Sequence, residues 1–155
     1  MDSSKPVLIA YDGSEGSKAA IDAAGGLFPD RRALVVSVWH SVATAAPASL
    51  IAIPAAVASR AYEELDGESK RQAEARVAEG VAAAKTAGLD ASGEAVLCAG
   101  QVWATIVNTA DEFDAQAIVV GSRGLSAVKS ALVGSVANGV LHHSTRPVVV
   151  VPAAS

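Results

Sequence analysis

The chain of 155 residues has only one cysteine, Cys98, and only 4% aromatic residues. A single cysteine excludes an internal disulfide and any metal site built from several cysteines. Because 34 of the hydrophobic residues are Ala, the core has to be formed mainly by Val, Leu, Ile and Ala. The hydrophobic share of 51% excludes a disordered or collagen-like chain. The length suits a single domain over residues 1–155.

Basic residues are also scarce, since twelve Lys and Arg stand against sixteen Asp and Glu and give a net charge of −4. A nucleic-acid-binding protein usually carries a basic stripe, so we expect no nucleic-acid partner. The first residues are too polar for a signal peptide, and Pro47 and Pro54 interrupt the uncharged stretch Ser41–Ser59. We therefore expect a cytoplasmic protein without a membrane span, in which Ser41–Ser59 is a mobile, weakly apolar loop.

Short β-branched runs alternate with helix-like segments along the whole chain. Continuous apolar runs are typical of strands that are buried on both faces. The alternation predicts a doubly wound α/β sandwich, with a five-stranded parallel sheet and helices on both faces. The predicted strands are Val7–Tyr11, Leu34–Trp39, Ala95–Cys98, Ala117–Val120 and Val148–Val151, and the predicted helices are Ser17–Phe28, Arg60–Ala87, Val102–Phe113 and Ser135–His143. In the first helix, Ala20, Ala24 and Leu27 are expected on one buried face.

Ligands of such sheets usually bind at the carboxyl ends of the strands, which points to Asp12, Trp39, Gly100 and Gly121. The last of these residues opens the most informative segment of the chain.

Three glycines follow the fourth predicted strand: Gly121, Gly124 three residues later, and Gly134 at the start of the last helix. Glycine permits a positive φ and lets the backbone approach a ligand closely. The N–H groups of Gly134, Ser135 and Val136 would lack partners within the helix, so they could bind a phosphate. The Ser135 hydroxyl could either cap its own helix or donate to a phosphate oxygen.

The charge of the C-terminal part supports the same site. Residues 115–155 contain no Asp or Glu but include Arg123, Lys129 and Arg146, so this part is +3 and the other residues carry −7 of the total of −4. A cationic patch favours a multiply charged phosphate ligand, although the last helix could simply face solvent with few acidic residues. Neither GxxxxGK[ST] nor GxGxxG after the first strand occurs, which excludes the usual P-loop and dinucleotide motifs.

The spacing Gly121-x-x-Gly124, then nine residues, then Gly134-Ser135, resembles the signature of the ATP-binding universal stress proteins. The opening VLIAYDGSEGSKAA and the closing Arg146-Pro147 followed by four valines are also similar to that family. The likeness extends from about Val7 to Pro152. It implies a sheet of order 3-2-1-4-5 that holds ATP, with Mg²⁺, over the first and fourth strands.

The resemblance also implies roles for single residues. Ala10 and Asp12 would lie near the adenosine, where Asp12 would accept from ribose hydroxyls or help to place the metal of Mg-ATP. Val38 would meet adenine through its backbone. The residues implied around the ribose and the phosphates are Gly121, Ser122, Arg123, Gly124, Gly134, Ser135 and Val136. No catalytic residue and no protein-only metal site is implied.

Asp12, the two neighbouring histidines and Gly139 need separate comment. Asp12 could serve only as the N-cap of the first helix. His142 and His143 do not predict a metal site, because neighbouring helical side chains point about 100° apart. Gly139 departs from the family pattern, and glycine inside a helix should cost about 1 kcal/mol relative to Ala.

Val148–Val151 would expose unpaired backbone groups if it forms a sheet edge, and pairing with a second copy would satisfy them. The resemblance implies the same homodimer. We therefore predict a nucleotide-dependent regulatory homodimer of the stress response, with an unknown protein partner, and not an enzyme. ATP would order the segment Gly121–Gly134 and a lid formed by Ser41–Ser59. The alternatives are a slow ATPase or phosphotransferase that uses the same pocket, and an interaction protein that binds no nucleotide.

Overall fold

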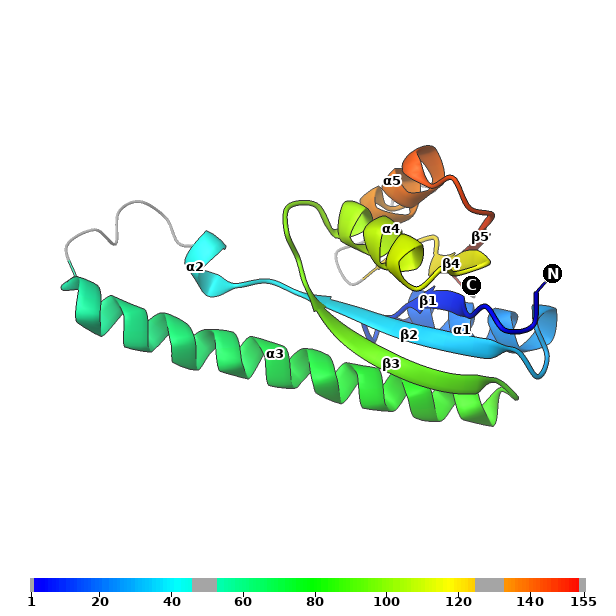
Figure 1. Cartoon of the computed structure of the whole chain (residues 1–155), viewed down its shortest axis with the longest axis horizontal. Helices are drawn as coiled ribbons and strands as arrows, with labels where there is room; N and C mark the ends of the chain where they lie inside the picture. Colours follow the sequence, from blue (N-terminus) through cyan, green and yellow to red (C-terminus); the bar gives the residue numbers. More distant parts are fainter. Residues whose placement is uncertain (1, 46–52, 125–132, 154–155) are drawn as a thin grey trace.

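The strands form one parallel sheet in the order β3-β2-β1-β4-β5. The computed structural model in Figure 1 describes residues 2–45, 53–124 and 133–153. The strands are β1 (Val7–Ala10), β2 (Arg32–Trp39), β3 (Asp90–Leu97), β4 (Ala117–Gly121) and β5 (Val148–Val151). The order and the parallel pairing confirm the α/β sandwich that the alternating sequence pattern predicts.

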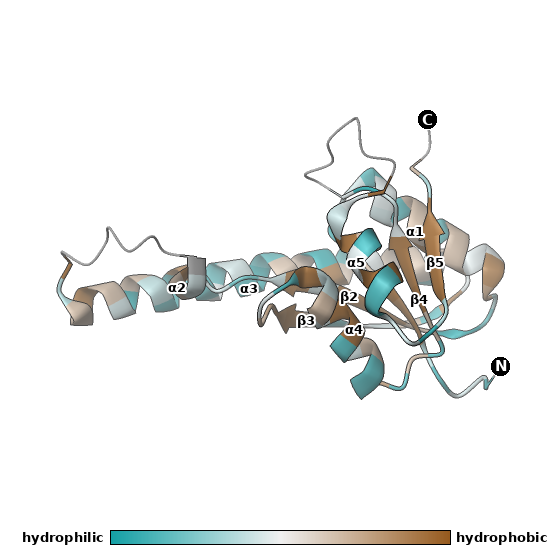
Figure 2. Ribbon diagram, turned by 90° about the horizontal axis from the view of Figure 1, so that it is seen from above, coloured by the Kyte–Doolittle hydropathy of each residue, from teal (hydrophilic) through white to brown (hydrophobic). Residues whose placement is uncertain are grey.

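Helices cover both faces of the sheet. Helices α1 (Glu15–Leu27) and α3 (Ala55–Thr86) pack on one face, and α4 (Val102–Glu112) and α5 (Ser135–His143) pack on the other. The one-turn helix α2 (Val42–Ala45) lies against α3. Figure 2 shows strong hydrophobic colouring in the strands that lie between the two layers.

Successive residues of the inner strands contribute to two separate cores. In β1, Val7 and Ile9 belong to the core beneath α1 and α3, whereas Leu8 belongs to the core beneath α4 and α5. All three are fully buried. A strand that is covered on both faces needs no polar side, which explains why the inner strands read as continuous apolar runs.

The edge strand β3 differs from its prediction, because it spans Asp90–Leu97 and not Ala95–Cys98. Its exposed Asp90 and Glu94 alternate with less exposed residues such as the buried Ala91. A search for continuous apolar runs misses such a strand, since only one of its faces is fully covered. The other strands agree with the predicted ranges to within two residues.

The stretch expected to be a loop is partly helical. Val42–Ala45 forms α2, and α3 begins at Ala55 and not at Arg60. Alanine is the strongest helix former, so the alanine-rich segments 42–45 and 55–59 are helical although they carry no charge. Residues 46–52 lie outside the described residues. At the first helix, Ala20 and Ala24 are buried as expected, but Leu27 is 59% exposed because it lies at the helix end.

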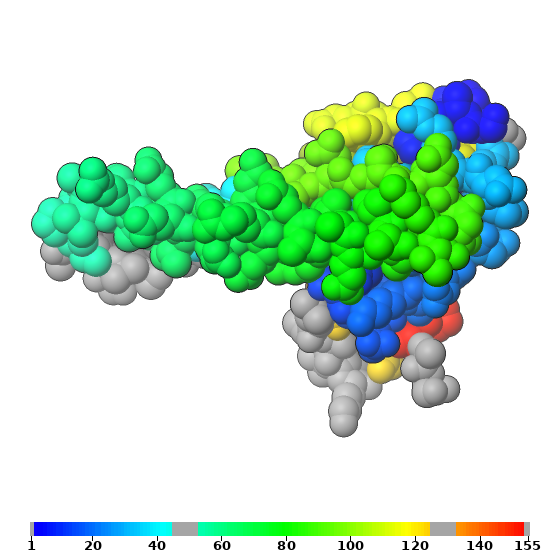
Figure 3. All heavy atoms as spheres, turned by 90° about the horizontal axis from the view of Figure 1, so that it is seen from below, coloured from blue at the N-terminus to red at the C-terminus, as the bar shows by residue number. Residues whose placement is uncertain are grey.

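The amino-terminal part of α3 extends beyond the sheet together with α2 (Figures 1 and 3). Asp66 of α3 holds α2 in place, because its carboxylate accepts hydrogen bonds from the Ser41 hydroxyl at 2.7 Å and from the Val42 N–H at 2.6 Å. Of the expected lid, residues 41–45 therefore lie against α3, and residues 55–59 belong to α3 itself.

Gly139 is explained by packing between α4 and α5. A Cβ on Gly139 would lie 2.2 Å from Cγ of Trp103, which is far inside van der Waals contact. The Trp103 ring also stacks on His143, with ring centroids 4.0 Å apart and planes 20° from parallel. The missing side chain thus lets the indole ring fill the space between the two helices. The helical cost of this glycine is offset by close packing.

We expect Gly139→Ala to destabilise the fold, although Ala is the better helix former. Its methyl group would push Trp103 out of place, and overpacking of this kind typically costs about 1–3 kcal/mol. Urea unfolding measures the change. The matched control is Asn138→Ala, an exposed position on the same helix, which should stay within about 0.5 kcal/mol of the parent chain. A Gly139→Ala chain as stable as the parent would contradict this account of Trp103.

Candidate functional site

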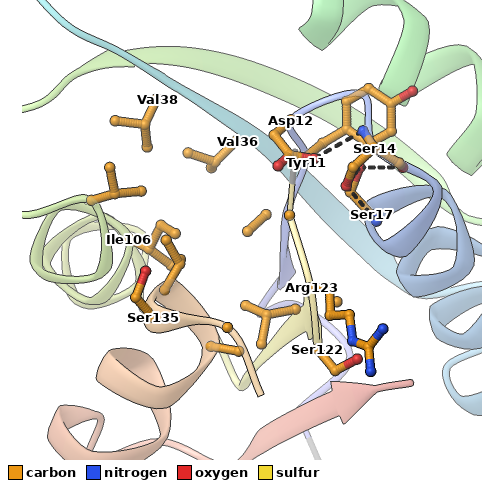
Figure 4. Close-up of a pocket in the computed structure, with 18 residues that line it drawn as sticks. Tyr11, Asp12, Ser14, Ser17, Val36, Val38, Ile106, Ser122, Arg123 and Ser135 are labelled. Atoms are coloured by element: carbon orange, nitrogen blue, oxygen red, sulfur yellow. Dashed lines mark hydrogen bonds between the residues drawn. The ribbon is translucent and has the colours of Figure 1, made fainter. Parts of the chain in front are cut away.

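A cavity of about 480 Å³ lies at the carboxyl ends of β1 and β4, beside the start of α5. Its size is typical of a small-molecule site, and it lies where the winding direction of the sheet reverses. Figure 4 shows Asp12 on one side of the cavity and Ile106 and Ser135 on the other. The structure brings to its walls all the residues that the resemblance implies around the ligand: Ala10, Asp12, Val38, Gly121, Ser122, Arg123, Gly124, Gly134, Ser135 and Val136.

One end of the cavity is aliphatic. Val36 and Val38 contribute from β2, and Val102 and Ile106 contribute from α4. Val36 and Ile106 are almost completely buried, whereas Val38 is half-buried. Such a surface suits a flat, weakly polar ring and does not suit a charged group.

The turn between β1 and α1 forms a polar wall. Gly13 has a φ of +83°, which only glycine adopts at little cost, and it turns the chain so that Asp12 Oδ1 accepts a hydrogen bond from Ser14 N–H at 2.9 Å. The N-cap of α1 is Ser14, whose hydroxyl accepts from Ser17 N–H at 3.2 Å. The interpretation of Asp12 as the N-cap is therefore wrong: it orders the preceding turn and lines the cavity (Figure 4).

The three glycines of the signature are needed because other groups lie close to their Cα atoms, and not because of unusual backbone angles. None of Gly121, Gly124 and Gly134 has a positive φ. A Cβ on Gly121 would lie 2.6 Å from the backbone of Gly16 in α1, so this glycine lets helix and strand meet. A Cβ on Gly124 would lie 2.8 Å from Asp12 Oδ2, so a side chain at Gly124 would disturb Asp12.

The start of α5 supplies the amide donors of the cavity. Gly134 is the N-cap, but its N–H donates to Ser122 O at 2.5 Å, so the prediction that this amide is available is wrong. The donors that helix geometry leaves without an intrahelical acceptor are the amides of Ser135, Val136 and Ala137, and all three residues line the cavity. Among the described residues, no side chain caps this helix.

Ser122 and Arg123 line the cavity, but their side chains lie differently from what the resemblance implies. The Ser122 hydroxyl is buried and accepts from Ala153 N–H at 3.3 Å, which ties it to the chain beyond β5. Figure 4 shows the Arg123 guanidinium pointing away from Ile106 and Ser135. A direct contact of either side chain with a phosphate would require rotation out of these positions.

The predicted cationic patch does not form as expected, because Arg123 lines the cavity and Arg146 lies far from it. Arg146 precedes β5 and therefore lies at the amino-terminal end of the parallel strands, opposite the cavity, where it binds Asp111 at 2.8 Å, Asp114 at 3.2 Å and the carbonyl of Ala115. The hydrogen bond with Asp111 raises the pKa of Arg146, and hydrogen bonds from Lys5 and Arg146 lower that of Asp114. Lys129 lies outside the described residues.

Two of the four positions after the strands do not reach the cavity. Trp39 and His40 line a separate hollow of about 220 Å³ between the end of β2 and α3. Gly100 is absent from the cavity walls. Cys98 is buried in the core and donates to the carbonyl of Gly100 at 3.2 Å. Within residues 2–45, 53–124 and 133–153, no three His, Cys, Asp or Glu residues are placed to hold a metal ion.

Several cavity residues were not singled out from the sequence because they look like ordinary core or capping residues. Only the three-dimensional structure shows that these residues line the same cavity. They are Tyr11, Ser14, Ser17, Val36, Val102, Ile106, Val120 and Ala137. None of the described helices is long and apolar enough to cross a membrane.

Solved structures with the same fold include nucleotide complexes. The hypothetical protein MJ0577 superposes with a TM-score of 0.80 at 20% identity over 99% of both chains. A universal stress protein in complex with cAMP gives 0.68 at 23% identity over 97% of this chain and 98% of that one. The universal stress protein from Archaeoglobus fulgidus in complex with dAMP gives 0.61 at 21% identity over 94% and 96%.

The sequence comparisons give the family. The curated relative "Universal stress protein YxiE" of Bacillus subtilis (strain 168) is 32% identical over 150 residues, which cover 94% of this chain and 97% of the relative. The model of the universal stress protein family matches residues 3–152. Since this match spans almost the whole chain and agrees with the glycine spacing, the chain belongs to the universal stress protein family.

Proposed function

We propose that the chain binds an adenine nucleotide, preferably ATP with Mg²⁺, and acts as a regulatory homodimer in the stress response of the cytoplasm. The observation that carries the proposal is one cavity with an aliphatic end and a helix N-terminus on its walls. The cAMP and dAMP complexes of proteins with the same fold support an adenine nucleotide as the ligand.

The residues present fit such a ligand. The aliphatic side chains of Val36, Val38 and Ile106 would cover the base. Asp12 and Gly124 both line the cavity, and Asp12 Oδ2 lies on the side of Gly124. From this position Asp12 would accept from a ribose hydroxyl or help to hold Mg²⁺. The amides at the start of α5 would donate to the phosphates, aided by the helix dipole. The absence of a side chain at Gly124 would leave room between these groups.

We propose binding without efficient turnover. Phosphoryl transfer needs a group that positions the attacking water or hydroxyl and further groups that stabilise the transferred phosphoryl. Among the described residues of the cavity walls, Asp12 is the only carboxylate, and its Oδ1 already accepts from Ser14 N–H. The output would be regulatory: ATP would favour one arrangement of the segment between Gly121 and Gly134, and a protein partner would recognise that arrangement.

We further propose that β5 joins two copies of the chain. The sheet has two edges, β3 and β5. The β3 edge exposes Asp90 and Glu94, charged residues that discourage edge pairing. The four valines of β5 are only half-buried, so pairing would cover them and satisfy the free backbone groups.

The hydrogen bonds of β5 identify the groups available for such pairing. On the side of β4, Pro147 O and Val151 O accept from Ile118 N–H and Ser122 N–H. Because alternate residues of a strand face opposite neighbours, Val148 and Val150 direct their N–H and C=O groups to the free edge.

We expect ATP with Mg²⁺ to bind the parent chain in equilibrium titration and Gly124→Ala to weaken this binding about tenfold or more, which corresponds to roughly 1.4 kcal/mol. The added methyl group would meet Asp12 Oδ2 and displace it from the cavity wall. The matched control is Gly26→Ala in α1, where a Cβ would meet no atom within 4 Å. No binding to the parent chain at millimolar nucleotide would reject the proposal in favour of the interaction protein without a nucleotide.

Hydrolysis is expected to be slow and incidental, with less than one turnover of ATP per minute, far below the usual range of enzymes near 1–10³ s⁻¹. Release of phosphate under saturating ATP measures the rate. Fast multiple turnover in the parent chain, lost in Asp12→Ala while ATP still binds, would establish the ATPase alternative instead.

We expect Val150→Pro to convert the dimer into a monomer, because proline removes an N–H that faces the free edge. Proline is tolerated at such edge positions, so the fold should persist. Light scattering after size exclusion measures the mass, and circular dichroism monitors the fold. The matched control is Ala95→Pro in β3. Asp90 N–H and Cys98 N–H donate to the carbonyls of Arg31 and Trp39, so the odd-numbered Ala95 directs its N–H to the free side. If Ala95→Pro alone breaks the dimer, β3 and not β5 forms the interface.

A further inference from the structure

Tyr11 lies between the last residue of β1 and Asp12, and its polar groups bind elements outside the turn. Its N–H donates to Val36 O at 2.8 Å, and its carbonyl accepts from the Ser37 hydroxyl at 2.5 Å. Ser37 is fully buried, so this hydroxyl is shielded from water. The carbonyl belongs to the peptide group that joins Tyr11 to Asp12, and its orientation is therefore held from β2.

The side chain of Tyr11 is held from α3. It is 3% exposed, and its hydroxyl donates to Glu79. Burial, together with the hydrogen bond to Glu79, raises the pKa of the Tyr11 phenol, so the group stays a donor at neutral pH. A Cβ on Gly80 would lie 3.0 Å from the Tyr11 ring, which shows that the backbone of α3 lies directly against it. Figure 4 shows the ring on the α3 side of the turn, away from Ile106 and Ser135.

Resting on the proposed nucleotide binding, we propose that Tyr11 is a positioning residue, which sets the place of Asp12 in the cavity through its hydrogen bonds with Glu79 and Ser37. Asp12 has one carboxylate oxygen on Ser14 N–H and the other on the side of Gly124. A rotation of the Tyr11–Asp12 peptide would shift both oxygens at once. The hydrogen bonds of the Tyr11 N–H to Val36 and of the Tyr11 carbonyl to Ser37 oppose this rotation, because they hold the backbone on both sides of the Tyr11 Cα.

The arrangement also connects the cavity to α3. Glu79 lies on this long helix, whose amino-terminal part extends beyond the sheet. Glu79 does not line the cavity, and its carboxylate contacts a wall residue through the hydrogen bond from Tyr11. Removing it should therefore reproduce the effect of removing the Tyr11 hydroxyl.

The test measures ATP affinity by calorimetry in single and double variants. Tyr11→Phe keeps the ring against Gly80 and removes only the donor, and we expect it to weaken binding about three- to tenfold. Glu79→Ala should cause the same loss without adding to that of Tyr11→Phe. Glu79→Gln keeps an oxygen acceptor and should bind like the parent chain. Glu74→Ala removes another exposed carboxylate of α3 and serves as the charge-matched control.

Combining Tyr11→Phe with Asp12→Asn distinguishes an effect through Asp12 from a general effect on the fold. Asp12→Asn keeps an oxygen acceptor for Ser14 N–H but removes the negative charge. If Tyr11 acts through Asp12, Tyr11→Phe should weaken binding little further in the Asp12→Asn chain. Ser37→Ala provides a second route to the same peptide and should show the same dependence on Asp12, with folding monitored by urea unfolding.

Three outcomes overturn the inference. Parent-like affinity of Tyr11→Phe would show that the hydroxyl does not matter. An equal loss in the presence and absence of the Asp12 charge would show that Tyr11 acts elsewhere. Failure of the parent chain to bind ATP would remove the proposed function itself, and the inference with it.

Discussion

The site depends on how closely α1 approaches the carboxyl end of β4. Backbone meets backbone there: a Cβ on Gly121 would lie 2.6 Å from Gly16, and a Cβ on Gly16 would lie 2.2 Å from the carbonyl oxygen of Arg123. Since no side chain intervenes, the turn after β1 and the segment after β4 form adjoining walls of one cavity. This contact brings Asp12 to Gly124, two residues that are more than a hundred positions apart in the chain.

The two ends of the cavity differ in what they can hold. At the aliphatic end, Val36 and Ile106 offer no hydrogen bond from their side chains, so only shape and backbone groups can select a ring there. At the other end, the amides of α5 favour negative charge. Among the described wall residues, Arg123 is the only lysine or arginine, and it is half-buried. A ligand with a flat ring and an anionic tail matches both ends at once.

The fold was predictable from the sequence because buried parallel strands read as unbroken apolar runs, as in Val7–Ala10 and Val148–Val151. The edge strand β3 was not, since its polar residues alternate with apolar ones. Glycine spacing pointed to residues that line the candidate cavity, but it did not give the packing role of each glycine. Gly121 and Gly139 face other parts of the chain, Gly16 and Trp103, and such neighbours become visible only in three dimensions.

The same limit explains the misplaced Arg146. Net charge counted along the sequence ignores at which end of the strands a residue lies, and Arg146 lies at the amino-terminal end of β5, remote from the cavity. There it joins Lys5 and the carboxylates of Asp111 and Asp114 to fasten α4 to the ends of two strands. These ion pairs and the candidate cavity thus lie at opposite ends of the strands of one sheet. Because the cavity walls and these ion pairs share no residue, substitutions around the cavity should leave the attachment of α4 intact.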